Sequence, residues 1–79
     1  MEKLDKRYKH YKDGFRYTVG FGLKTNFEKY LLVIDWCEQI YGPTSQNKNW
    51  RIDQYSKWNR QIYLCEEAAI MFALKFGAL

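Results

Sequence analysis

The sequence contains little of what disordered chains, membrane spans and secretion signals require. One proline and five glycines among 79 residues, with 47% apolar and 19% aromatic side chains, argue against a disordered chain. No apolar run approaches the roughly 18 residues of a membrane span, and the charged N-terminus lacks the apolar core of a signal peptide. We therefore expect one small domain, located in the cytoplasm and without a membrane partner.

Cysteine and histidine are also scarce. Cys37 and Cys65 each lie in an apolar stretch, where a free thiol packs as a small hydrophobic group. We expect both thiols to be buried; the alternatives are a disulfide and a metal or catalytic role. Because two isolated cysteines and one distant histidine cannot form a structural zinc site, we expect no metal and no other cofactor.

Residues that would form a catalytic site are missing as well. His10 lies in a basic stretch with no serine or cysteine placed as a nucleophile, and we expect it to be exposed to solvent. The Gly20-Phe21-Gly22 sequence lacks the third glycine and the lysine–hydroxyl pair of phosphate-binding loops. Polar helix faces and a helix N-terminus explain the neighbouring acidic residues without paired-carboxylate catalysis. We therefore expect that the protein is not an enzyme.

What the sequence does have is positive charge at one end. The net charge is +4, and residues 1–16 contain six Lys or Arg side chains against three acids, whereas the remainder is almost balanced. Such an arm either contacts an acidic partner or is a solvated tail that aids solubility. Five of its residues are candidate nucleic-acid contacts: Lys6, Arg7, Lys9, Lys12 and Arg16.

We divide the chain into a basic N-terminal arm or edge segment, residues 1–14, and a compact domain, residues 15–79. The first segment has three alternative structures. It is an extra edge strand, in which Asp13 and Gly14 turn residues 7–12 back to pair Tyr8 near Val19, or a short helix, or a mobile arm.

A strand is predicted for residues 15–23, because every second residue is apolar and faces inward, while the residues between them face outward. Its inward face comprises Phe15, Tyr17, Val19, Phe21 and Leu23. A helix follows, because Thr25 and Glu28 have the spacing of a capping box and Gly42-Pro43 is a helix stop. Its apolar stripe comprises Phe27, Tyr30, Leu31, Ile34, Cys37 and Tyr41, widened by Val33 and Ile40.

A hairpin is predicted next, and its register follows from the apolar pattern. Directly opposed residues share a face of the sheet, so Ile52 must oppose Ile62 and Trp50 must oppose Leu64. This register makes residues 56–58 the loop and places Trp58 at the hairpin tip.

The final predicted element is a helix over residues 66–77, with two acids at its N-terminus, Lys75 near its C-terminus and Gly77 closing it. Its core side comprises Ala69, Phe72, Ala73 and Phe76, flanked by Ile70, Met71 and Leu74. The element order β-α-β-β-α predicts an α+β fold. In this fold a three-stranded antiparallel sheet, in the order 1-3-2, carries both helices on one face.

Basic and aromatic residues gather around the hairpin, and these are the candidate partner-binding residues: Arg51, Tyr55, Lys57, Trp58 and Arg60. Trp58 either folds back as a lid over the sheet edge or stays exposed as an interface hot spot. We expect the sheet face away from the helices to be open, so that the phosphate backbone and a base of a nucleic acid could bind there. Its residues are Arg16, Thr18, Arg51 and Tyr63, although the sequence has no RNA-recognition consensus.

Several stretches carry a resemblance when they are taken together. They are Trp36-Cys37-Glu38, Tyr41-Gly42, Trp58, and residues 62–77 with their strand, acidic helix start and apolar helix closed by glycine. In this pattern residues 15–77 resemble small uncharacterised accessory proteins of tailed bacteriophages. The resemblance implies a phage-encoded accessory protein that acts in the bacterial cytoplasm; it supplies no active site, and residues 1–14 lie outside it.

We expect a small non-enzymatic accessory protein that binds a host or phage protein and modulates it. One alternative is a nucleic-acid-binding accessory protein that uses the basic arm and the basic, aromatic hairpin. Another is a homo-oligomeric structural component that associates through the glycine-bearing sheet face.

Overall fold

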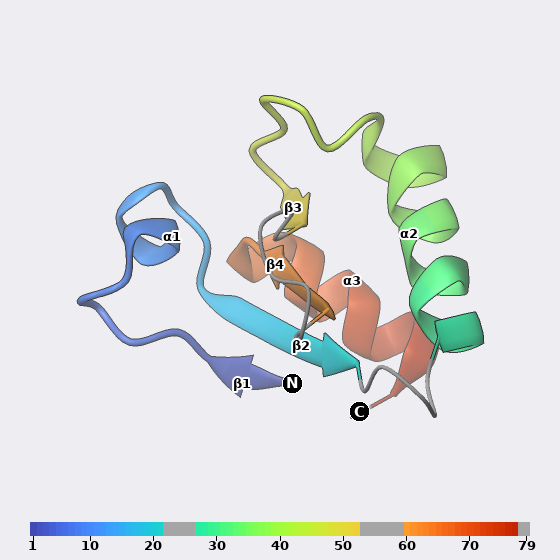
Figure 1. Cartoon of the computed structure of the whole chain (residues 1–79), viewed down its shortest axis with the longest axis horizontal. Coiled ribbons are helices and arrows are strands. Elements are labelled where there is room, and N and C mark those ends of the chain that lie inside the picture. The colour runs from blue at the N-terminus through green and yellow to red at the C-terminus, as the bar shows by residue number, and fades with distance from the viewer. Residues whose placement is uncertain (22–26, 53–59, 78–79) are drawn as a thin grey trace.

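The computed structural model describes residues 1–21, 27–52 and 60–77 (Figure 1). Its elements are β1 (Glu2–Lys3), α1 (Lys9–Lys12), β2 (Tyr17–Phe21), α2 (Phe27–Tyr41), β3 (Trp50–Ile52), β4 (Arg60–Leu64) and α3 (Glu66–Phe76). The strands form one antiparallel sheet in the order β1-β2-β4-β3. The predicted α+β class is therefore confirmed.

This sheet has four strands, so the prediction of three was wrong. The additional strand, β1, pairs with the free edge of β2, with Glu2 opposite Thr18 and Lys3 opposite Tyr17. With two residues, β1 is too short to show the alternation by which a strand is recognised in a sequence. The other three strands are neighbours in the order predicted for them.

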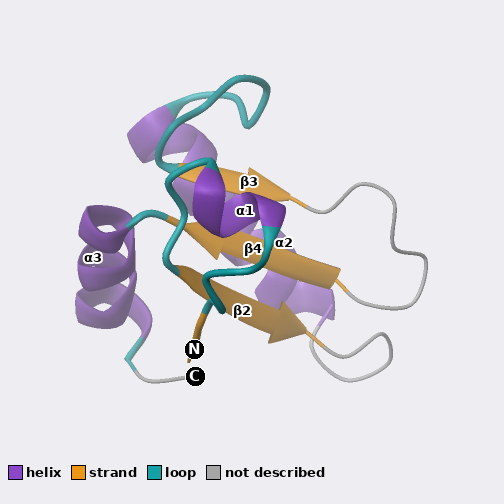
Figure 2. Ribbon diagram, turned by 90° about the vertical axis from the view of Figure 1, so that its left-hand side faces the viewer, coloured by secondary structure: helices purple, strands orange, loops and turns teal. Residues whose placement is uncertain are grey.

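The N-terminal segment combines two of the alternatives left open by the sequence. Lys9–Lys12 is helical, so the edge strand over residues 7–12 is not formed, and the strand that does form lies earlier in the chain. Figure 2 shows α1 in front of the sheet and α2 behind it. Both long helices pack on one face, as predicted, because their buried residues join one cluster with the inward residues of the strands, and α1 lies on the other face.

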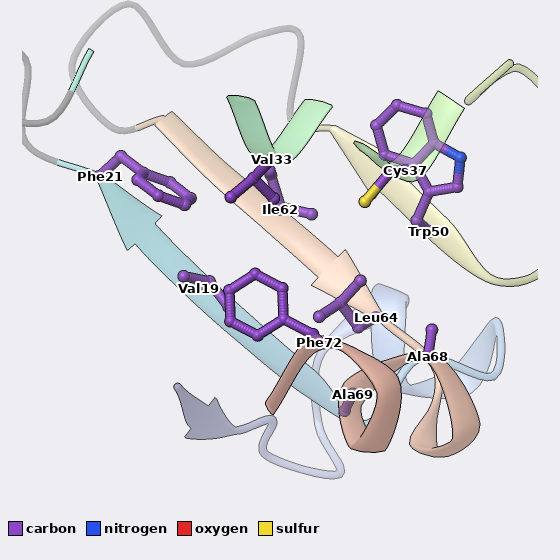
Figure 3. Close-up of a cluster of buried hydrophobic side chains, with 10 residues drawn as sticks. All are labelled: Val19, Phe21, Val33, Cys37, Trp50, Ile62, Leu64, Ala68, Ala69 and Phe72. Carbon is purple, nitrogen blue, oxygen red and sulfur yellow. The ribbon is translucent and has the colours of Figure 1, made fainter. Parts of the chain in front are cut away.

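The main core lies between the sheet and the two long helices (Figure 3). It consists of Val19, Phe21, Val33, Cys37, Trp50, Ile62, Leu64, Ala68, Ala69 and Phe72. In the β3–β4 pair, Trp50 opposes Leu64 and Ile52 opposes Ile62, which confirms the predicted register. Because side chains alternate along a strand, this register turns these apolar residues toward the helices.

The buried side of α2 is narrower than the predicted apolar stripe. Val33 and Cys37 are fully buried, whereas Phe27, Leu31 and Ile40 are 44%, 48% and 55% exposed. The prediction that these three residues belong to the core was wrong, because an apolar stripe this wide exceeds the part of a helix that one small sheet can cover. The predicted helix stop is confirmed: α2 ends at Tyr41, and Gly42 has φ +86°.

Helix α3 packs on the sheet through a small part of its surface. Ala68, Ala69 and Phe72 are buried, and of these Ala68 was not among the predicted core residues. The thiol of Cys65 caps the helix by accepting a hydrogen bond from the Ala68 N–H at 3.4 Å. The helix ends at Phe76 and is followed by Gly77 with φ +77°, as the terminal glycine predicted. Within the described ranges, no helix has the length and apolar character needed to cross a membrane.

Candidate binding surfaces

The sheet face predicted to be open is covered by the N-terminal segment. The His10 ring stacks on the Tyr63 ring, with centroids 3.8 Å apart and an interplanar angle of 20°. Tyr63 is therefore only 8% exposed, and His10 is half-buried. The predictions of an exposed His10 and an open Tyr63 were wrong, because Gly14, with φ +108°, lets the chain reverse and lays the preceding residues over the sheet.

Arg51 fastens this segment to the sheet. Its Nη1 donates a hydrogen bond to Asp13 Oδ2 at 2.7 Å and lies 3.2 Å from His10 Nδ1. Its guanidinium is also 4.7 Å from the centre of the Phe15 ring. Phe15 is buried, as predicted, at 1% exposure, but it lies outside the main core cluster and before β2, which begins only at Tyr17. The hydrogen bond from Arg51 lowers the pKa of Asp13, although desolvation opposes this effect.

The two described residues of the predicted partner-binding set do not share a surface. Arg60 lies opposite Phe21, and its guanidinium is 4.3 Å from the centre of the Phe27 ring on the helix side of the sheet. Arg51 contacts the N-terminal segment on the other side. The remaining predicted residues, Tyr55, Lys57 and Trp58, lie outside the described residues, and so does the choice between lid and hot spot for Trp58.

The five candidate nucleic-acid contacts differ in their surroundings. Arg7, with its side chain 87% exposed, pairs with Asp5, and the hydrogen bonds from Arg7 lower the pKa of that carboxyl. The three lysines, Lys6, Lys9 and Lys12, are exposed. Arg16 is half-buried. Two of the five, Lys6 and Arg16, line one cavity together.

That cavity is a cleft of about 360 Å³ between the N-terminal segment, the start of β2 and the start of α3. Its lining residues, which we call the basic cleft, are Lys3, Leu4, Lys6, Tyr11, Arg16, Tyr17 and Glu66. The pairing of Lys3 with Tyr17 and a 2.9 Å hydrogen bond from the Leu4 N–H to the Arg16 carbonyl hold its walls together. Lys3 and Tyr17 were not among the predicted site residues, because they join the others only when β1 pairs with β2.

Within the basic cleft, Arg16 is held in a fixed orientation. Its Nη1 donates hydrogen bonds to the Tyr11 carbonyl at 2.8 Å and to the Phe15 carbonyl at 3.1 Å. The guanidinium also lies over the Tyr11 ring, 4.0 Å from its centre. In the described part of the chain, neither Nε nor Nη2 of Arg16 has a hydrogen-bond acceptor.

A second candidate surface is apolar and lies on the helix layer. Among the described residues, the large apolar side chains exposed there are Phe27, Leu31, Leu32 and Ile40 on α2 and Ile70, Met71 and Leu74 on α3. On α3, Leu74 is 78% exposed and Ile70 is 57% exposed. The sequence placed the three α3 residues on the flanks of the core, but the buried side of this short helix is formed by smaller residues and one ring.

Among the described residues, the thiols and the acidic groups form no further candidate site. Burial raises the pKa of the Cys37 thiol to about 12, so this group stays protonated at neutral pH. Cys37 is buried as predicted, whereas Cys65 is only half-buried, and both are free thiols. Across residues 1–21, 27–52 and 60–77, no three His, Cys, Asp or Glu side chains lie close enough together to hold a metal ion.

Comparisons of the chain with protein-family models, curated proteins and solved structures found no match. The function is therefore inferred from the two surfaces: the basic cleft beside the N-terminal segment and the apolar face of the helix layer.

Proposed function

We propose that the protein is a non-enzymatic accessory protein that binds another protein through the outer face of α3. The supporting observation is the exposure of Ile70, Met71 and Leu74. Their spacing puts them side by side, because residues three and four positions apart are neighbours on a helix. Contiguous apolar patches on the surface of a small protein typically mark interaction sites.

The charges at the two ends of this face indicate which charges the partner's surface should carry. Glu66 and Glu67 are exposed at the N-terminal end of α3, and Lys75 is exposed at the C-terminal end. A complementary surface has an apolar centre, a basic group that meets the glutamates and an acidic group that meets the lysine. The resemblance to small proteins of tailed bacteriophages favours a host or phage protein as the partner, and binding modulates it by occupying its surface.

Leu74 is the best single residue with which to test this proposal. Covering a side chain that is 78% exposed contributes about 1.5–2 kcal/mol to binding, which corresponds to a change in Kd of roughly tenfold or more. Replacing it with glutamine keeps a good helix former and removes little packing within the folded chain, so the fold is retained.

The experiment captures proteins from nuclease-treated bacterial lysate with the wild-type protein, with Leu74→Gln and with Tyr8→Gln. Tyr8 is 59% exposed but lies on the N-terminal segment, so its variant controls for the loss of an exposed apolar group elsewhere. We expect the control to retain the wild-type partner and Leu74→Gln to bind it at least tenfold more weakly. Equal capture by all three proteins would count against the proposal.

Two further arms of the experiment identify other partners. A lysate without nuclease tests the nucleic-acid alternative, because a protein captured only in that arm is held through nucleic acid. Sedimentation velocity on the purified protein tests whether the partner is a second copy of this chain. In that case Leu74→Gln shifts the sedimentation coefficient toward that of a monomer and Tyr8→Gln does not.

A further inference from the structure

We propose that the basic cleft binds a phosphate group. This inference is independent of the protein-binding role of α3, because the cleft is formed mainly by the N-terminal segment and β2. It rests on three observations: the fixed guanidinium of Arg16, the unpaired lysines beside it and the size of the cleft.

The guanidinium of Arg16 has one edge occupied and one edge ready for a ligand. Both bonds from Nη1 go to backbone carbonyls, and the ring of Tyr11 supports the plane from one side. The remaining donors, Nε–H and the Nη2 amino group, form the edge with which arginine binds two oxygens of one phosphate. Because the orientation is already fixed, little conformational entropy is lost when a ligand binds.

The other charged residues of the cleft strengthen its affinity for an anion. Lys3 and Lys6 line it together with Arg16, and Glu66 is its only acidic residue. Within the described ranges the ion pairs are Arg7–Asp5 and Arg51–Asp13, neither of which involves a cation of the cleft. Three cations against one carboxylate leave a local excess of positive charge, which concentrates phosphate-bearing ligands.

The size of the cleft indicates a phosphate that is attached to a larger group. At about 360 Å³ it falls within the range of small-molecule sites and has room beyond a phosphate. Leu4 and the half-buried ring of Tyr17 line the same cleft and offer apolar surface to a sugar or a base. The ligand class is thus a phosphate monoester of the nucleotide type, either free or at the 5′ end of a nucleic-acid strand.

The test is a set of NMR titrations that follow backbone amide shifts in the full chain. The probes are inorganic phosphate, AMP, and one short oligonucleotide with and without a 5′ phosphate. We expect AMP, or the phosphorylated oligonucleotide in preference to the unphosphorylated one, to shift the amides of Leu4, Arg16 and Tyr17 saturably. Binding of AMP indicates a free nucleotide, whereas binding of the phosphorylated strand alone indicates a strand end.

Three variants distinguish a specific phosphate site from general attraction of the ligand to positive charge. Lys6→Gln and Lys9→Gln remove the same charge from the N-terminal segment, but only Lys6 lines the cleft. We expect Lys6→Gln to raise the Kd by about threefold to tenfold and Lys9→Gln to change it by less than about twofold. Arg16→Lys keeps the charge but loses the two-donor edge, so it weakens binding as well.

Two results would overturn the inference. The first is that no probe shifts the cleft amides saturably, or that AMP does not bind and the two oligonucleotides bind equally well. The second is that Lys6→Gln and Lys9→Gln weaken binding to the same extent, since that result describes a diffuse basic surface. Because both lysines are exposed, neither variant alters the fold, and the comparison remains decisive even where Arg16→Lys loosens the segment.

Discussion

Trp50 connects the sheet to the end of α2. Replacing it with phenylalanine measures how much this connection contributes to the stability of the protein. Trp50 is the largest fully buried side chain in the structure, at 0% exposure. Its Nε1 donates a hydrogen bond to the Gly42 carbonyl at 2.9 Å, just beyond the last residue of α2. Phenylalanine keeps an aromatic ring at this position but removes the donor and part of the ring system.

The expected loss of stability has two contributions. The hydrogen bond contributes about 1 kcal/mol, and its loss leaves the half-buried Gly42 carbonyl without this donor. The smaller ring leaves a cavity that costs about another 1–2 kcal/mol in a core that cannot fully collapse. The sum of about 2–3 kcal/mol is a large fraction of the stability of a small domain, for which the lower end of the usual range is about 5 kcal/mol.

The assay is urea unfolding followed by far-UV circular dichroism, with Trp36→Phe as the matched control. Trp36 is half-buried against Phe72 and Phe76, and its indole N–H has no acceptor among the described residues. With a urea slope of about 1 kcal/mol per molar, the midpoint of Trp50→Phe should fall by about 2–3 M and that of Trp36→Phe by about 1 M or less. Equal losses in the two variants would refute the role assigned to the Trp50–Gly42 bond.

Three other outcomes are expected from the structure. Phe72→Ala should destabilise the protein by about 3–5 kcal/mol, because it empties a fully buried site; an unchanged melting temperature would contradict the packing described above. The pKa of Cys37 rises from its ordinary value of 9.0 to about 12, so the unfolded thiol ionises first and stability should fall as the pH rises from about 9 toward 12. Urea midpoints at about pH 8 and about pH 11 check this, and Cys37→Ala should reduce the difference. Asp13→Asn should increase hydrogen exchange at the Phe15 amide more than Asp5→Asn does, because only Asp13 is bound to Arg51; equal exchange in the two variants would show that this ion pair does not fasten the segment.

The elements that the sequence predicted well are those with local or strictly periodic causes. The register of Trp50 against Leu64 followed from the rule that opposed residues share a face, because a one-residue slip would turn every apolar side chain outward. The end of α2 followed from Gly42, whose φ of +86° few other residues tolerate. The two helices and the order of three strands then followed from the connections between them.

The width of the core could not be predicted in the same way. Periodicity shows which residues of α2 lie near one another, but it does not show how much of that surface a neighbouring element covers. Leu31 and Val33 both belong to the apolar stripe, yet one is 48% exposed and the other is fully buried. The difference depends on the area of the sheet beneath the helix, which is a property of the assembled fold.

The candidate site was hidden from the sequence for a similar reason. The sequence identified the basic N-terminal segment and named Lys6 and Arg16, because charge and composition are local properties. It did not reveal that β1 joins the sheet, that His10 covers Tyr63, or that Lys3 and Glu66 line one cleft. Residues 63 positions apart are brought together only by tertiary contacts. The segments that make these contacts are too short or too irregular to show a periodic pattern in the sequence.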